Sequence, residues 1–436
     1  MSGEAAVGLP FEAVQTRDYV PDAGHVIIAA AAVSFASVGM TIGLPMPVAL
    51  ANAVVMTAVA AIALALMDRI ELALWGLVSL LAVVRAEPAP VDFMVVALFV
   101  ALVSRGEILG AAPHPLALVA AMLFVTSNLL ALLFAVDVGR GIAHAATTVY
   151  LMVLAYVSYR LAVRGHEHGE RAYIAASVAL VVITVATLLG APLTETLRYD
   201  DERVQGLFKD PNVYGPFVVP AVTLLMLGVG PRSALARAVL IGALVIPVAA
   251  SQSRGALLAF GVAAVAVGAV AVFRRWGSAL AVSVGIGTLA IAGLVAYAIV
   301  SADGTSHALL EEQVYDANRF AAQDATLTYL ADHPFTLGVG PGNARDVLGT
   351  VNDIHETYLR ILLETGPLGL IGLALLIALA LSPLRVARPA AAAWAAAIVG
   401  FLAVGLFIDI FHWRHFWAAA AIGMAATASV RADATR

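Results

Sequence analysis

The chain contains no cysteine. Disulfide bonds, cysteine-ligated metal sites and thiol chemistry are therefore excluded, and any segment outside a membrane must be held by packing and hydrogen bonds. Charged residues are also scarce: they make up 12% of the 436 residues, against about 25% in an ordinary soluble domain. This composition lies outside the range of soluble domains.

Lysine is nearly absent as well. The chain has 24 lysine and arginine residues. Lys209 is the single lysine, and all the others are arginine. Arginine suits two-pronged contacts with phosphate, although a GC-rich genome produces the same bias. The net charge of −5 is unremarkable, and we expect no nucleic-acid partner.

Apolar residues are abundant. They make up 62% of the chain, and its mean hydropathy is +0.95. Apolar runs recur along nearly the whole length and reach the about 20 residues that a helix needs to cross a bilayer. These runs predict an all-α polytopic membrane protein, because a spanning segment must satisfy its backbone hydrogen bonds internally.

We predict one transmembrane helical domain over residues 1–436, with roughly 12 to 14 spanning helices. They are expected at 26–43, 46–67, 70–84, 91–103, 115–135, 143–163, 173–191, 213–230, 234–250, 255–273, 278–300, 357–381, 389–408 and 412–430. The count has a range because the third and fourth runs are short and are separated by Arg85-Ala-Glu-Pro-Ala-Pro90.

Basic residues in short loops favour the cytoplasmic side of a membrane. If the amino terminus lies in the cytoplasm, the arginines that also lie on the cytoplasmic side are Arg69, Arg105, Arg164, Arg171, Arg232, Arg237, Arg274, Arg275, Arg385 and Arg388. The periplasmic side then receives a loop at 192–212, a short turn at 251–254 and a large segment at 301–356, before the third-last helix. These outer segments still hold several basic residues, which either pair with acidic neighbours or bind an anion.

Three of the predicted helices, starting near 213, 255 and 357, run inward from that outer side. The first turn of a helix offers unpaired N–H groups and a partial positive charge, which suit an anion. The polar motifs that precede these starts are Arg203-Val-Gln-Gly-Leu-Phe-Lys-Asp-Pro-Asn212, Ser251-Gln-Ser-Arg-Gly255 and His355-Glu-Thr-Tyr358. Each motif also has a structural explanation. Asp210 fits the N-cap of a helix and Pro211 its first position. Arg254, taken by itself, fits an arginine whose side chain snorkels to the membrane interface.

His355 stands at the start of the third of these helices. The positive end of the helix dipole disfavours a protonated imidazole there, which keeps the ring available as a base. Glu356, Arg360 and Glu364 follow at four-residue spacing, so we expect them to pair along one face. Gly366, with Gly369 after it, indicates close approach of another helix or of a ligand, and packing is the commoner reason.

A glycine-rich run, Gly338-Val-Gly-Pro-Gly342, lies upstream of this histidine, after Arg319 and Asp332-His-Pro-Phe335. Such a turn can present backbone N–H groups to a phosphate. No Lys-Ser or Lys-Thr pair follows the run, so a nucleotide P-loop is excluded.

Together these motifs resemble the O-antigen ligase and polymerase superfamily of polytopic bacterial inner-membrane glycosyltransferases. The resemblance covers roughly residues 200–372 and is carried by Arg203, Gly206, Asp210-Pro-Asn212, Ser253-Arg254-Gly255, Arg319, Pro334, Gly338-Val-Gly340, His355, Gly366 and Gly369. Each motif is weak alone, but their order and spacing are fairly specific.

The resemblance implies transfer of a glycan from an undecaprenyl-pyrophosphate carrier to a sugar hydroxyl, on the periplasmic side of the inner membrane. Membrane lipid would surround the donor, and neither a cofactor nor a metal ion is expected. The pyrophosphate would be held by Arg203, Arg254 and Arg319, with Lys209 and Asn212 beside them. His355 would be the base that takes the proton of the acceptor hydroxyl, with inversion at the anomeric carbon.

One position departs from the family pattern. Ligases commonly carry Asn, Ser or Gln after the motif histidine, whereas this chain has Glu356, so the base is either His355 or Glu356. The acceptor is also open: a ligase would use lipid A-core, and a polymerase would extend lipid-linked O-antigen or exopolysaccharide repeat units. A membrane transporter is the third candidate, although the charges here lie at the ends of apolar runs rather than at mid-membrane. We expect Arg203, Arg254 and His355 to line one common cavity.

Overall fold

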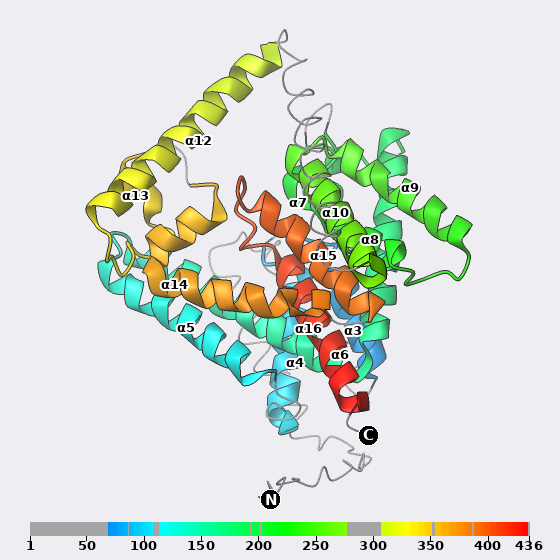
Figure 1. Ribbon diagram of the computed structural model, residues 1–436. Coiled ribbons are helices and arrows are strands. Elements are labelled where there is room, and N and C mark those ends of the chain that lie inside the picture. Colours follow the sequence, from blue (N-terminus) through cyan, green and yellow to red (C-terminus); the bar gives the residue numbers. More distant parts are fainter. Residues whose placement is uncertain are drawn as a thin grey trace, which may run out of the picture.

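The computed structural model describes residues 69–85, 87–107, 113–191, 194–199, 203–276, 307–350, 354–385 and 388–434. In these ranges the regular elements are helices (Figure 1). Four of them are long and apolar enough to cross a membrane: Pro115–Phe134, Val138–Leu188, Arg254–Phe273 and Thr357–Leu384. The predicted all-α polytopic membrane class is confirmed. The helices expected at 26–43, 46–67 and 278–300 lie outside the described residues.

The first helices are α3 (Ile70–Leu80), α4 (Pro90–Ser104), α5 (Pro115–Ala131), its short 3-10 extension η2 (Leu132–Phe134) and α6 (Val138–Leu188). They are followed by η3 (Glu195–Leu197), α7 (Pro211–Phe217), α8 (Val219–Met226), α9 (Ala234–Ala250) and α10 (Arg254–Trp276). The last are α12 (His307–Asp332), α13 (Ala344–Leu348), α14 (Thr357–Leu381), η4 (Ser382–Arg385), α15 (Pro389–Val404) and α16 (Arg414–Ala434). The helices predicted at 234–250 and 357–381 have the same bounds in the structure.

The helices expected at 143–163 and 173–191 together make up α6. Gly165, in the polar stretch between them, has non-helical φ and ψ of −175° and 56°, so α6 consists of two helices that meet at a kink. A kink therefore stands where the sequence predicted a loop. Beside it, the Arg164 guanidinium lies 2.7 Å from the Glu107 carboxylate.

The helix predicted at 213–230 is divided in two. Its halves, α7 and α8, meet at Val218. Pro216 and Pro220 flank this point, and a proline removes one backbone donor from the helix and crowds the preceding turn. The start of α7 thus lies on a helix of seven residues.

The outer segment 301–356 contains a long helix that was not predicted. It is α12, which runs for 26 residues and is much less apolar than the spanning helices. Its sequence has neither glycine nor proline, and Pro334 follows its end. Helix propensity therefore suffices to explain it. In Figure 1, α12 and α13 lie at one edge of the molecule, next to the start of α14.

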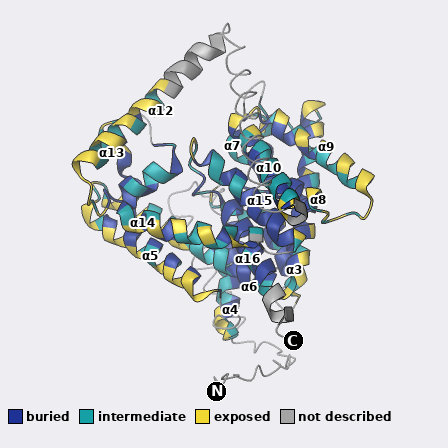
Figure 2. Ribbon diagram, in the orientation of Figure 1, coloured by how far each residue is buried: buried dark blue, intermediate teal, exposed yellow. Residues whose placement is uncertain are grey.

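The core lies where α3, α6, α10, α15 and α16 meet. Residues 390–397 of α15, which the sequence predicted to pack closely, are all buried (Figure 2). A side chain at Gly400 would collide with the backbone of α10, because a Cβ there would lie 2.5 Å from the Ala259 carbonyl oxygen. Small residues thus let α15 and α10 approach closely.

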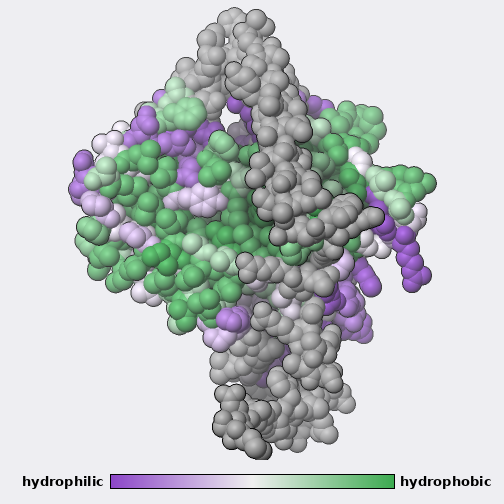
Figure 3. Space-filling view, viewed as in Figure 1, coloured by the Kyte–Doolittle hydropathy of each residue, from purple (hydrophilic) through white to green (hydrophobic). Residues whose placement is uncertain are grey.

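The outward faces of several helices are apolar. Exposed large hydrophobic side chains on α5 are Leu116, Leu118, Val119, Met122, Leu129 and Leu130. Figure 3 shows an apolar surface over α5 and α14, with hydrophilic residues gathered over α12 and α13. Such a surface fits contact with lipid rather than water.

Candidate active site

The start of α14 is fixed by Glu356. Its two carboxylate oxygens accept hydrogen bonds from the Tyr358 N–H at 3.1 Å and the Leu359 N–H at 2.5 Å. Glu356 is therefore the N-cap of this helix, which satisfies donors that the first turn leaves unpaired. Burial raises the pKa of the Glu356 carboxyl, although these two backbone donors oppose the shift. His355 directly precedes the cap and is half-buried.

The predicted pairing along the face of α14 is half correct. Arg360 pairs with Glu364, at 3.1 Å from its Nε to the carboxylate. Glu356 does not join them, because its oxygens cap the helix, and the Arg360 Nη1 instead lies 2.9 Å from Asp409. Arg360 thus links α14 to Asp409, a contact that the sequence did not predict.

The turn Gly405–Asp409 holds the start of α14. The Thr357 N–H donates to the Gly405 carbonyl at 2.9 Å, and the Thr357 hydroxyl donates to the Ile408 carbonyl at 2.9 Å. The same hydroxyl oxygen accepts from the Ile410 N–H at 3.0 Å. These three hydrogen bonds place His355, two residues before Thr357, beside this turn.

Two other predicted motifs reach the same turn. The Arg319 guanidinium of α12 donates to the Phe407 carbonyl. At the start of α10, Gly255 lies so close that a Cβ there would be 3.1 Å from the Ile408 side chain. Arg254 is the neighbour of that glycine. The structure therefore brings the segments of Arg254, Arg319 and His355 together around one turn.

Arg203 links the starts of α7 and α10. Its Nη2 donates to the Asn212 side-chain oxygen at 3.2 Å, and its Nε donates to the Ser251 carbonyl at 3.2 Å. The guanidinium also lies over the Tyr199 ring, 5.6 Å from its centre. Since Ser251 is three residues from Arg254, Arg203 contacts the segment that carries the cation of the second motif.

The local geometry of the first motif is as predicted. The Asp210 carboxylate accepts from the Asn212 N–H at 2.8 Å, and Pro211 is the first residue of α7. Gly206, upstream, has a positive φ of 56°, and a Cβ there would lie 2.7 Å from the Tyr214 ring. Only glycine fits this position without strain.

The glycine-rich run has a structural role instead of the phosphate role that its sequence allows. In α14, Gly366 has φ 70°, and the next residue, Pro367, has no N–H to give the Leu363 carbonyl. The Val339 N–H donates to that carbonyl at 3.0 Å. The Gly340 N–H donates to the Glu364 carbonyl at 3.2 Å. Both N–H groups therefore bond backbone carbonyls of α14 at the break in this helix.

The glycines of α14 confirm the packing interpretation. A Cβ at Gly366 would lie 2.6 Å from the Thr336 carbonyl oxygen, and one at Gly369 would lie 2.9 Å from the Ser127 hydroxyl of α5. Both positions therefore mark close approach of neighbouring protein segments.

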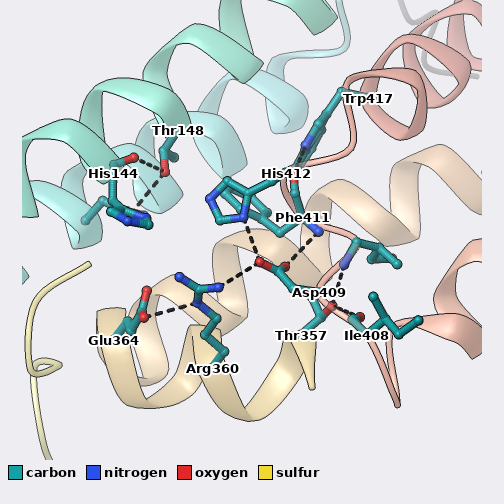
Figure 4. Close-up of polar contacts among 12 residues, drawn as sticks. His144, Thr148, Thr357, Arg360, Glu364, Ile408, Asp409, Phe411, His412 and Trp417 are labelled. Atoms are coloured by element: carbon teal, nitrogen blue, oxygen red, sulfur yellow. Dashed lines mark hydrogen bonds and ion pairs between the residues drawn. The ribbon is translucent and has the colours of Figure 1, made fainter. Parts of the chain in front are cut away.

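A partly buried polar cluster surrounds Asp409, the last residue of the turn (Figure 4). The Asp409 carboxylate is 2.6 Å from His412 Nδ1 and also accepts from the Phe411 N–H at 3.0 Å. Burial alone would raise the pKa of Asp409, but His412 and the Arg360 guanidinium outweigh it and hold this pKa well below its usual range. The His144 ring of α6 meets the His412 ring edge to face, with 5.8 Å between centres.

Sequence reasoning missed Asp409 and His412. A signal was present, because Asp409 lies between the last two predicted helices and His412 is the first residue of the last one. Charged groups in such a position usually have partners or a function. Their partner Arg360, however, is 49 residues away from Asp409 and could not be identified from spacing.

A cavity of about 160 Å³ opens beside this cluster. Its lining residues are Val84, Glu87, Phe208, Lys209, Val213, Asp409, His412, Trp413, Arg414 and His415. Lys209 is thus placed here, where its ammonium lies 2.7 Å from the Glu87 carboxylate. The lining of this cavity contains none of Arg203, Arg254 and His355. The segments of Arg254 and His355 meet at the turn Gly405–Asp409, whereas Arg203 contacts Asn212 and Ser251. A cavity common to the three residues stays a prediction.

The fold and these polar groups define a class: a polytopic helical membrane protein in which the segments that carry Arg254, Arg319 and His355 meet at one turn. Residues 238–374 match a protein family described as O-antigen ligase. A search of the curated proteins finds no match. The family match supports the O-antigen ligase and polymerase superfamily, and with it a membrane glycosyltransferase that acts on lipid-linked glycans. Arg254, Arg319 and His355 lie inside the matched stretch, whereas Arg203 and Asp409 lie outside it.

Proposed function

We propose that this protein transfers a glycan from an undecaprenyl-pyrophosphate carrier to a sugar hydroxyl at the periplasmic face of the bacterial inner membrane. The observation that carries the proposal is the convergence on one turn of Arg254, Arg319 and His355, each through a contact of its own segment. A leaving pyrophosphate needs cations, and an attacking hydroxyl needs a base. The gathered residues supply both kinds of group.

In the proposed reaction, the acceptor oxygen attacks the anomeric carbon of the donor. The bond from that carbon to the phosphate oxygen breaks, the bonding electrons leave with the pyrophosphate, and the acceptor proton passes to His355. Arg203, Arg254 and Arg319 stabilise the charge that develops on the leaving group. Direct displacement inverts the anomeric configuration.

We assign the base to His355 rather than Glu356. Both Glu356 oxygens accept backbone hydrogen bonds at the helix start, so removing this carboxylate from its place would uncap α14. His355 lies at the same helix end without forming the cap. The positive end of α14 favours its neutral form, which can accept a proton.

Two versions of this function differ in the acceptor. A ligase transfers the glycan to lipid A-core, and a polymerase transfers it to another lipid-linked repeat unit of O-antigen or exopolysaccharide. We favour the ligase, in agreement with the description of the matched family.

The test is a reconstituted reaction in proteoliposomes with an undecaprenyl-pyrophosphate-linked oligosaccharide as donor. We expect transfer to purified lipid A-core, detected as a mass increase of the core by one glycan. Longer lipid-linked chains without core product would assign the polymerase instead. Absence of both products, with donor and acceptor intact, would overturn the proposal, and a transport assay would then test the carrier alternative.

A further inference from the structure

The cavity next to Asp409 has walls of two kinds. Aromatic rings come from Phe208, Trp413 and His415, and the Trp413 and His415 rings are stacked with 5.3 Å between centres. Charged side chains come from Glu87, Lys209 and others. A ligand that suits both walls has an apolar face and polar edges, which is the chemistry of a sugar ring.

The charges of the cavity are compensated within the protein. Lys209 is paired with Glu87, and Arg414 binds both oxygens of Asp92, at 2.6 and 2.9 Å. Asp409 in turn is held between Arg360 and His412. A diphosphate would compete with carboxylates for these cations, whereas hydroxyl groups can share them as additional hydrogen-bond partners.

The aromatic wall is firmly packed. His415 is 2% exposed, and Phe217 and Phe401 meet its ring edge to face. The ring therefore forms a rigid apolar backing behind Trp413.

We propose that this cavity binds one uncharged pyranose ring of the glycan substrates, with Lys209 and Glu87 as hydrogen-bonding residues and Trp413 as an apolar wall. The inference rests on the proposed function. The cavity has a volume of about 160 Å³. On the same measure one water needs only about 10–15 Å³, so the cavity has room for a single ring. Asp409 belongs both to the cavity lining and to the turn that holds the start of α14, so a ring bound here adjoins the transfer site.

The first test measures binding without catalysis. Saturation-transfer NMR is recorded on the detergent-solubilised protein with methyl glucoside, methyl galactoside and methyl N-acetylglucosaminide as probes. We expect a signal from at least one probe with the wild type and an equal signal with His355→Ala. Val213→Phe should abolish the signal because it fills the cavity. The matched control Val239→Phe, on an exposed position of α9, should retain it.

Two charge variants test the cavity without filling it. Lys209→Gln and Glu87→Gln change half-exposed side chains and are expected to leave the fold intact. Each should weaken probe binding by about ten- to a hundredfold, which corresponds to one hydrogen bond with a charged group. Glu71→Gln, which alters an exposed carboxylate of α3 outside the cavity, is the control.

Steady-state kinetics then identify the source of the ring. A raised KM for the acceptor with an unchanged KM for the donor would place the acceptor sugar in the cavity, and the reverse would place the donor sugar there. Unchanged binding and unchanged KM values in Val213→Phe, Lys209→Gln and Glu87→Gln would overturn the sugar site while leaving the transferase intact. Probe binding that depends on the cavity, without any transfer by the wild type, would overturn the proposed function alone.

Discussion

Arg360 and Asp409 form a partly buried ion pair, 2.9 Å apart, that joins α14 to the segment before α16. The two side chains are only 12% and 13% exposed. Because Asp409 also binds His412 and the Phe411 N–H, this pair connects α14 with the wall of the cavity. The geometry of the proposed transfer site, at the start of α14, therefore depends on it.

Asp409→Asn is expected to destabilise the protein by about 1.5–3 kcal/mol, because it removes one of the two carboxylates that pair with the Arg360 guanidinium and leaves Glu364 as the other. The measurement is thermal unfolding in detergent. Asp346→Asn is the control, since its ion pair with Arg140 lies at the surface. A double-mutant cycle with Arg360→Met should give a coupling of roughly 0.5–3 kcal/mol. Additive effects would show that the pair is not an energetic unit.

His355→Ala is expected to lower the transfer rate by at least about a hundredfold, the usual contribution of a general base. The protein should remain folded, because His355 does not cap α14. Glu356→Gln should change the rate only slightly, since the amide oxygen still accepts a backbone hydrogen bond at the helix start. Initial rates of glycan transfer measure both. The opposite order of the two variants would assign the base to Glu356.

Arg203→Ala and Arg254→Ala are expected to raise the KM for the pyrophosphate donor, each by about ten- to a hundredfold, as loss of a charge-assisted contact predicts. Lysine at either position should restore only part of the affinity, because the planar fork of the guanidinium is lost. Arg345→Ala, on an exposed position of α13, serves as the control. An unchanged donor KM in both alanine variants would remove these arginines from the donor site.

Gly366→Ala is expected to cost about 1–3 kcal/mol, because the left-handed backbone strains any other residue and the new methyl group would meet the Thr336 carbonyl. Gly268→Ala in α10 is a matched control. A Cβ there has no neighbour within 4 Å, so alanine should be stabilising by about 0.5–1 kcal/mol through its helix propensity. Equal melting temperatures for the two variants would contradict the assignment of the kink to Gly366.

We expect the stability of the protein to depend on pH through the Glu87 carboxyl. Burial tends to raise its pKa, but Lys209, with Arg414 and His412, outweighs burial and lowers it from 4.5. A carboxyl with a lowered folded-state pKa stabilises the protein above its unfolded pKa, and this stabilisation is lost as the pH falls through the folded value. The melting temperature of the wild type should therefore exceed that of Glu87→Gln above about pH 4.5, and the difference should shrink below it. The effect should be small and salt-sensitive, because Glu87 is half-exposed. A difference that grows on acidification would contradict this sign.

The predicted site residues differ in how far the sequence could place them. Asp210 as an N-cap and Pro211 at the first helical position are local features, and both are present. The grouping of Arg203 with Arg254 followed from two helix starts with the same orientation, and in the structure Arg203 contacts the segment that carries Arg254. Lys209 was grouped with them because it is close in sequence, yet its side chain pairs with Glu87, which is 122 residues away.

Hydropathy and capping are properties of neighbouring residues, so the amino-acid sequence by itself determined the helical membrane class, the bounds of α9 and α14, and the motifs that resemble the transferase superfamily. Only the tertiary structure decided that the glycine-rich run completes the broken hydrogen bonds of α14, and that Asp409 and His412 join the site. These outcomes depend on contacts between distant segments. The energy of such a contact comes from burial and geometry in three dimensions, which residue spacing along one chain does not contain.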